Sequence, residues 1–139
     1  MKLSGGAWKF AQEDISTDLI RGKAWSHLPP KEQGAHCLEE VDATFAAKAQ
    51  PGDFIVGGKN FGCGSSTAAH VAVIGLGIGA VLAESLGKLF VTNAASAGLW
   101  AVTCPGIIEF CNAGDKLELD TVNWQVRNLT TGQTIAAKP

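Results

Sequence analysis

The chain has 139 residues, which is enough for one compact domain and too few for two ordinary ones. Apolar residues make up 46% of the chain and charged residues 17%, a balance that excludes intrinsic disorder. The formal net charge of -2 excludes the basic character typical of nucleic-acid-binding proteins. No apolar run reaches the ~18 residues of a membrane span, and the first residues lack the apolar stretch of a signal peptide. We therefore expect one domain over residues 1–139, located in the cytoplasm, with neither a membrane nor a nucleic acid as partner.

The predicted elements begin with a short strand at residues 7–10, where apolar and polar residues alternate. A polar loop over 13–18 follows, and then a long loop over 21–33 that contains two adjacent prolines. A short helix is predicted over 42–49. After a turn at 51–53, the continuous apolar run at 54–57 predicts a buried strand.

In the second half, a glycine-rich loop at 59–64 leads into a predicted helix at 68–76 and a buried strand at 80–83. A helix over 86–97, ended by Gly98, precedes a strand at 99–103. Alternating residues predict an antiparallel pair of strands at 116–120 and 123–126. This order of strands and helices predicts an α/β core with a β-rich flank.

The four cysteines are Cys37, Cys63, Cys104 and Cys111. They form no Cys-x-x-Cys pair, and no histidine lies near them at a spacing typical of zinc sites. A chain without a signal peptide is also a poor disulfide candidate. We expect no metal on this chain and at least three reduced cysteines packed as small apolar side chains.

The most informative segment runs from Lys59 to Ser66, where glycines are followed by hydroxyl residues at the start of a predicted helix. The first N–H groups of a helix lack internal partners and lie at its positive end. Such a site suits a carboxylate or phosphate, and it would also stabilise a serine alkoxide. The alternative is that these hydroxyls only cap the helix, because Ser and Thr are preferred caps.

The run Gly58-Lys59-Asn60-Phe61-Gly62-Cys63-Gly64-Ser65-Ser66 resembles the signature of the small subunit of 3-isopropylmalate dehydratase, in the aconitase superfamily. Residues 14–18 resemble the acidic D-x-x-T-D loop of that family. The likeness extends over nearly the whole chain, through residues 35–37, 51–56, 80–85, 90–94 and 98–99.

This resemblance implies an α/β fold of the swivelling β/β/α type found in aconitase small subunits. It implies a large-subunit partner that holds a [4Fe-4S] cluster, and a reversible hydration or dehydration of a hydroxy di- or tricarboxylic acid. Ser65 matches the catalytic serine of the family, whose alkoxide takes a proton from carbon. Ser66 matches a position that binds a substrate carboxylate, and we count Gly64 and Asn60 of the same loop among the expected substrate-binding residues.

The sequence departs from the family pattern directly after the two serines. The family usually reads Ser-Ser-Arg-Glu-His, whereas here the serines are followed by Thr67, two alanines and His70. A threonine hydroxyl cannot replace the two parallel hydrogen bonds of an arginine. Arg21 or Lys23, from the preceding loop, could supply the missing positive charge, or both could be ordinary solvated charges.

We therefore expect Thr67, Arg21 and Lys23 to contribute to a changed substrate preference, for example for a substituted malate, maleate or citraconate-type compound. A second hypothesis is a non-catalytic small-molecule-binding or regulatory module that kept the swivel fold. The missing arginine favours this second hypothesis, and the retained Ser65 favours the lyase subunit.

Overall fold

The computed structural model describes residues 1–64 and 68–139. Over these residues the strands form one seven-stranded sheet in the order β4-β3-β2-β1-β5-β6-β7. The strands are β1 (Lys2–Phe10), β2 (Phe54–Gly57), β3 (Ala80–Ala83), β4 (Trp100–Thr103), β5 (Lys116–Asp120), β6 (Gln125–Asn128) and β7 (Thr134–Ala136). The helices are α1 (Thr17–Ile20), α2 (Pro30–Gly34), α3 (Phe45–Lys48), α4 (His70–Leu76), α5 (Lys88–Ser96) and α6 (Ile107–Phe110), with a 3-10 turn η1 (Lys23–Trp25). None of these helices is long and apolar enough to cross a membrane.

β1 joins the two halves of the sheet. Residues 7–10 pair in parallel with β2, and residues 2–6 pair antiparallel with β5. The sequence predicts a strand only at residues 7–10, and it predicts neither of these two pairings. The missed segment contains two consecutive glycines, and a partner more than 100 residues away in the sequence aligns it.

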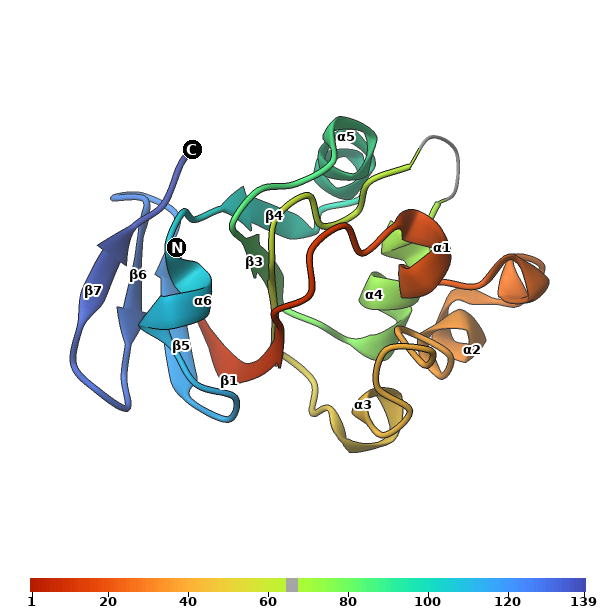
Figure 1. The fold of residues 1–139 in the computed structure, drawn as a ribbon, viewed down its shortest axis with the longest axis horizontal. Coiled ribbons are helices and arrows are strands. Elements are labelled where there is room, and N and C mark those ends of the chain that lie inside the picture. The colour runs from red at the N-terminus through yellow and green to blue at the C-terminus, as the bar shows by residue number, and fades with distance from the viewer. Residues whose placement is uncertain (65–67) are drawn as a thin grey trace.

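Two cores lie on opposite faces of the sheet. In β2, Ile55 points into a core shared with helices α1, α3, α4 and α5, whereas Phe54 and Val56 point into a core shared with α6, β5 and β6. This separation follows from the alternation of side chains along a strand. Figure 1 shows the result, with α1 to α4 on one side of the molecule and α6 with β5 to β7 on the other.

The predicted long loop over 21–33 is partly helical. It contains η1 and most of α2, which begins with Pro29 as its N-cap and Pro30 at the first helical position. Proline is favoured there because its missing N–H would have no helical partner. α2 packs closely against α4, since a Cβ on Gly75 would overlap the Pro30 carbonyl oxygen. The predicted helix at 68–76 is confirmed as α4, which is shorter by two residues and ends at Gly77 in the left-handed conformation.

Candidate functional site

The glycine loop, residues Gly58–Gly64, leaves the end of β2 and lies between two other segments at the same edge of the sheet. These neighbours follow β1 and β3, and they meet the loop because the carboxyl ends of adjacent parallel strands lie side by side. The loop is thus held on both sides by backbone hydrogen bonds. The donors and acceptors are Gly62 N to Ile15 O (2.7 Å), Thr17 N to Cys63 O (2.8 Å), Phe61 N to Ser85 O (3.1 Å) and Gly87 N to Phe61 O (2.9 Å).

Three residues of the glycine loop have positive φ angles: Asn60 (59°), Gly62 (79°) and Gly64 (110°). At Gly62 a Cβ would lie 2.7 Å from the ring of Phe90, so glycine is required both for the backbone and for space. At Gly64 a Cβ would lie 3.0 Å from the Thr17 hydroxyl oxygen. The acidic loop and the glycine loop are therefore in close contact immediately before Ser65.

The predicted catalytic residue Ser65 and the predicted substrate-binding residues Ser66 and Thr67 lie outside the described residues. Gly64 on one side and Ala68 on the other are described, and both have contacts with the segment 17–21. These flanking residues and their neighbours form the described surroundings of the expected site.

Arg21 is buried, with 5% of its surface exposed. Its Nη1 donates to Gln33 Oε1 at 3.2 Å and to the Ala68 carbonyl oxygen at 3.4 Å. The guanidinium thus lies beside the first described residue after the two serines. Arg21 is not the solvated loop charge that was one alternative from the sequence.

Lys23, in contrast, points into solvent. Its side chain is 75% exposed, and its Nζ lies 3.9 Å from an oxygen of Asp18. Such an exposed pair contributes little to stability and leaves the ammonium group solvated. The two loop cations that were equivalent candidates in the sequence therefore have different environments.

Asn60 is exposed, and its side-chain amide donates to Asp14 Oδ1 at 2.9 Å. Its backbone N–H donates to the Ser85 hydroxyl at 2.7 Å. In this structure Asn60 joins the glycine loop to its two neighbouring segments, and its amide is occupied by a protein carboxylate.

Two residues near the start of α4 carry polar atoms that sequence reasoning did not select. His70 is half-buried, and its Nδ1 is buried without a partner among the described residues. Burial, followed by the nearby positive charge of Arg21, lowers the pKa of His70. Gln33 is 5% exposed, and its Nε2 donates to the carbonyl oxygens of Leu28 (2.7 Å) and Ser26 (3.4 Å). Gln33 belongs to no motif, and only the fold brings it to Arg21.

Cysteine ligands for a metal or cluster are not gathered in the described part of the chain. In that part of the chain, no group of three or more His, Cys, Asp or Glu side chains is arranged so that it could hold a metal ion. Cys37 belongs to one core, Cys104 and Cys111 belong to the other, and Cys63 lies in the glycine loop. The described residues therefore do not fit an iron–sulfur cluster by themselves.

One pocket, of about 390 Å³, is lined in part by Gly58 and Lys59 of the glycine loop. Its lining includes Lys59 together with the carboxylates of Glu13, Glu84 and Glu109. Both oxygens of Glu84 accept backbone hydrogen bonds, from Gly106 N (2.8 Å) and Ile108 N (2.9 Å). Three carboxylates and one ammonium do not suit an anionic ligand, so this pocket does not extend the expected substrate site.

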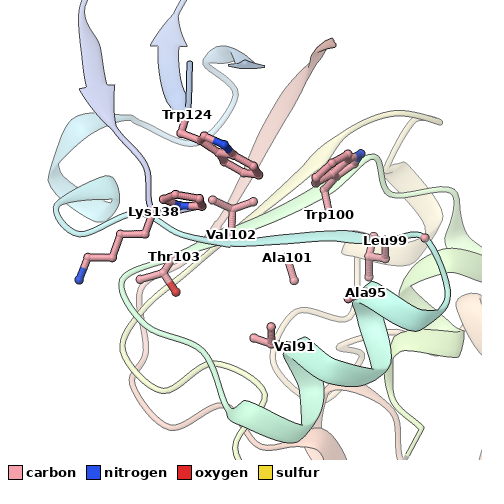
Figure 2. Close-up of a pocket in the computed structure, with 11 residues that line it drawn as sticks. Val91, Ala95, Leu99, Trp100, Ala101, Val102, Thr103, Trp124 and Lys138 are labelled. Carbon is pink, nitrogen blue, oxygen red and sulfur yellow. The ribbon is translucent and has the colours of Figure 1, made fainter. Parts of the chain in front are cut away.

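A second pocket, of about 520 Å³, lies along β4 and is mainly apolar. Figure 2 shows Trp100 and Trp124 on one side of β4 and Val91 and Ala95 of α5 on the other. The ring centroids of the two tryptophans are 6.0 Å apart. None of the residues predicted for the site lines this pocket, so it is distinct from the glycine loop.

Comparison with known families matches residues 9–106 of the chain to the aconitase C-terminal domain. The matched range contains the glycine loop, Arg21, Gln33 and α4. The fold and the glycine loop thus define a domain of the aconitase C-terminal class.

Individual relatives narrow this class. The chain is 40% identical over 141 aligned positions to the 3-isopropylmalate dehydratase small subunit of Thermodesulfovibrio yellowstonii, covering 100% of this chain and 83% of that protein. It is 38% identical to the isopropylmalate/citramalate isomerase small subunit of Methanocaldococcus jannaschii, covering 96% and 80%. The crystal structure of a 3-isopropylmalate dehydratase from Methanocaldococcus jannaschii superimposes with a TM-score of 0.93 at 34% identity, covering 99% of this chain and 82% of that one. The chain belongs to the family of 3-isopropylmalate dehydratase small subunits, and the expected swivelling fold is confirmed.

Proposed function

We propose that this chain is the small subunit of a heteromeric aconitase-type hydro-lyase, active with a large subunit. The reaction is the reversible hydration or dehydration of a hydroxy di- or tricarboxylic acid. Family membership supports the reaction class, because relatives are named as small subunits of 3-isopropylmalate dehydratase. The observation that carries the proposal is the glycine loop, held between the segments after β1 and β3 and leading directly to Ser65.

In the proposed mechanism, Ser65 acts as the general base. Its deprotonated oxygen takes the proton from the substrate carbon, the C–H electron pair forms the double bond, and the hydroxyl of the neighbouring carbon leaves with the C–O electron pair as hydroxide. A proton from solvent or from the large subunit then converts this hydroxide to water. In the reverse direction Ser65 returns the proton to carbon. Ser66, Thr67, Gly64 and Asn60 are proposed to bind substrate, together with the positive charge of the preceding loop.

The [4Fe-4S] cluster is proposed to belong to the large subunit, because the described residues of this chain do not assemble ligands for it. Its iron would supply Lewis-acid chemistry. We propose that the residues of this chain position the serine base and bind carboxylate groups of the substrate.

The substrate is proposed to differ from 3-isopropylmalate. Thr67 stands where the resemblance places an arginine, and a neutral hydroxyl pairs poorly with a carboxylate in a closed site. A substituted malate, maleate or citraconate-type compound fits this change.

The test is Ser65→Ala in the complex co-expressed with its large subunit. We expect turnover to fall by ~10²–10⁴-fold while complex formation is retained, since that is the usual contribution of a general base. Ser96→Ala, at the exposed end of α5, is the matched control and should keep full activity. If Ser65→Ala stays within a few-fold of wild type, Ser65 is only a cap. If the wild-type complex binds hydroxy acids without converting any of them, the chain is instead a binding module.

A further inference from the structure

Arg21 is a buried cation without a described counter-ion. The two side-chain hydrogen bonds that it makes with described residues go to neutral oxygens, those of Gln33 and Ala68. In the described part of the chain, its Nε has no hydrogen-bond partner. The ion pairs found there join Lys23 to Asp18 and His36 to Glu39, and neither involves Arg21. A buried charge with no partner is costly, so this environment favours an added anion.

A second buried nitrogen belongs to His70, the first residue of α4. His70 Nδ1 has no partner among the described residues either, and the positive charge of Arg21 is near enough to lower the pKa of His70. A lowered pKa keeps the imidazole neutral at pH 7, so Nδ1 can carry one hydrogen to donate without adding a second charge. Nitrogen donors without a described partner, on Arg21 and on His70, match a ligand group that only accepts, as a carboxylate does.

The orientation of the guanidinium is fixed by its neighbours. Gln33 Nε2 donates to two backbone carbonyl oxygens, which leaves Gln33 Oε1 to accept from Arg21 Nη1. Gln33 itself belongs to α2, whose backbone contacts α4 at Gly75. Arg21 is therefore held rigidly against the start of α4, and little entropy would be lost when an anion binds.

We propose that Arg21 is the specificity-determining residue that binds one carboxylate of the substrate, in place of the arginine that the family pattern has at position 67. The proposal rests on the proposed function, and it assigns this role to Arg21 alone and not to Lys23. It implies that the substrate keeps at least two carboxylates, one of them near the start of α4. The guanidinium approaches from α1 rather than from the segment before α4, so substrates of a different shape are accepted.

The chain offers a direct test, because Arg21 and Arg127 are its only two arginines. In a ¹⁵N-labelled full chain, the two Nε–H signals can be assigned with Arg21→Gln and Arg127→Gln. Titration with malate should shift the Arg21 signal in a saturable way and leave the signal of Arg127, which lies on the exposed side of β6, unchanged. Malate dimethyl ester, which lacks the charges, should shift neither. An Arg21 signal that moves no more than that of Arg127 overturns the proposal.

Kinetics of the complete heteromer give an independent readout. Arg21→Gln should raise KM for the dicarboxylic substrate at least 10-fold, whereas Lys23→Ala and Arg127→Gln should leave KM within two-fold. An unchanged KM in Arg21→Gln, in a complex that turns over substrate, overturns the role of Arg21 and leaves the lyase function intact. A malate-dependent shift of Arg21 in a complex without any turnover supports the carboxylate site and contradicts the lyase function.

Discussion

The cysteine side chains differ sharply in their environments. Burial raises the pKa of Cys37 and of Cys104 to about 12, and burial also raises the pKa of Cys111. Cys63 is half-buried in the glycine loop. Because the thiolate is the reactive form, we expect one of the four thiols to react rapidly with a disulfide reagent at pH 8. Thiol titration of the folded chain measures this number, and Cys63→Ser should reduce it to zero. Rapid reaction of two or more thiols would contradict the assignment.

The carboxylate of Asp120 makes the stability of the fold depend on pH in the acid range. Backbone hydrogen bonds from Asn123 and Val122, and then the Asn123 amide, lower the pKa of Asp120 to about 2. The folded pKa lies below the ordinary value of 3.8, so this stabilisation is present above pH 4 and is lost as the pH falls towards 2. We therefore expect Asp120→Asn to lower Tm at pH 7 and to differ less from wild type at pH 2. The exposed Glu40→Gln is the control and should follow wild type throughout.

Thr67→Arg tests the changed substrate. An arginine at this position restores the two-pronged donor of the family pattern, so the variant complex should gain activity on 3-isopropylmalate. Activity on 3-isopropylmalate and on malate-type substrates should be compared for wild type and variant. Efficient wild-type turnover of 3-isopropylmalate, with no gain in the variant, would contradict a changed preference.

The different environments of Arg21 and Lys23 show which features of the site the sequence alone cannot predict. The motif singles out Ser65, because glycines followed by serines have a specific local meaning, and the role of Ser65 stays a prediction. It could not separate Arg21 from Lys23, because burial depends on contacts with α2 and α4 rather than on adjacent residues. Gln33 and His70 were missed as neighbours of Arg21 for the same reason.

Among the elements, the contact between α2 and α4 depends on glycine. In an ordinary helix Gly→Ala stabilises by about 1 kcal/mol. At Gly75 the added methyl would meet the Pro30 carbonyl oxygen, and overpacking costs about 1–3 kcal/mol. We expect Gly75→Ala to lower the free energy of unfolding in urea, despite its better helix propensity. A variant more stable than wild type would show that α2 can move away from α4 without cost.

The sequence predicts best the elements in which every residue is equally buried. β2 and β3 are buried at every residue, and their continuous apolar runs gave the correct bounds. β7 and α6 were missed because three and four residues are too few to show a period. The sequence predicts the second strand of the antiparallel pair at 123–126, two residues before β6, because Asn123 and Trp124 alternate like strand residues. In the structure both residues lie in the turn. Trp124 there has a φ of 52°.

At the scale of the whole molecule, the chain should fold without its partner and yet be inactive alone. Both cores are filled by its own described residues, so folding does not need a second subunit. Circular dichroism of the isolated chain should show a cooperative thermal transition, while iron analysis and a dehydratase assay should both give background values. Stoichiometric iron, or turnover without a large subunit, would contradict this division of roles.

The central place of β1 also has a consequence for synthesis on the ribosome. β1 precedes both of its partner strands in the chain, so residues 7–10 must wait for 54–57 and residues 2–6 must wait for 116–120. Long-range pairing of this kind is slow and leaves a nascent strand open to wrong partners. Residues 2–6 of β1, which pair last, include Lys2, Ser4, Gly5 and Gly6. A segment of this composition has little tendency to aggregate. Residues 2–6, which carry no strand pattern in the sequence, can thus stay unpaired safely until β5 has been synthesised.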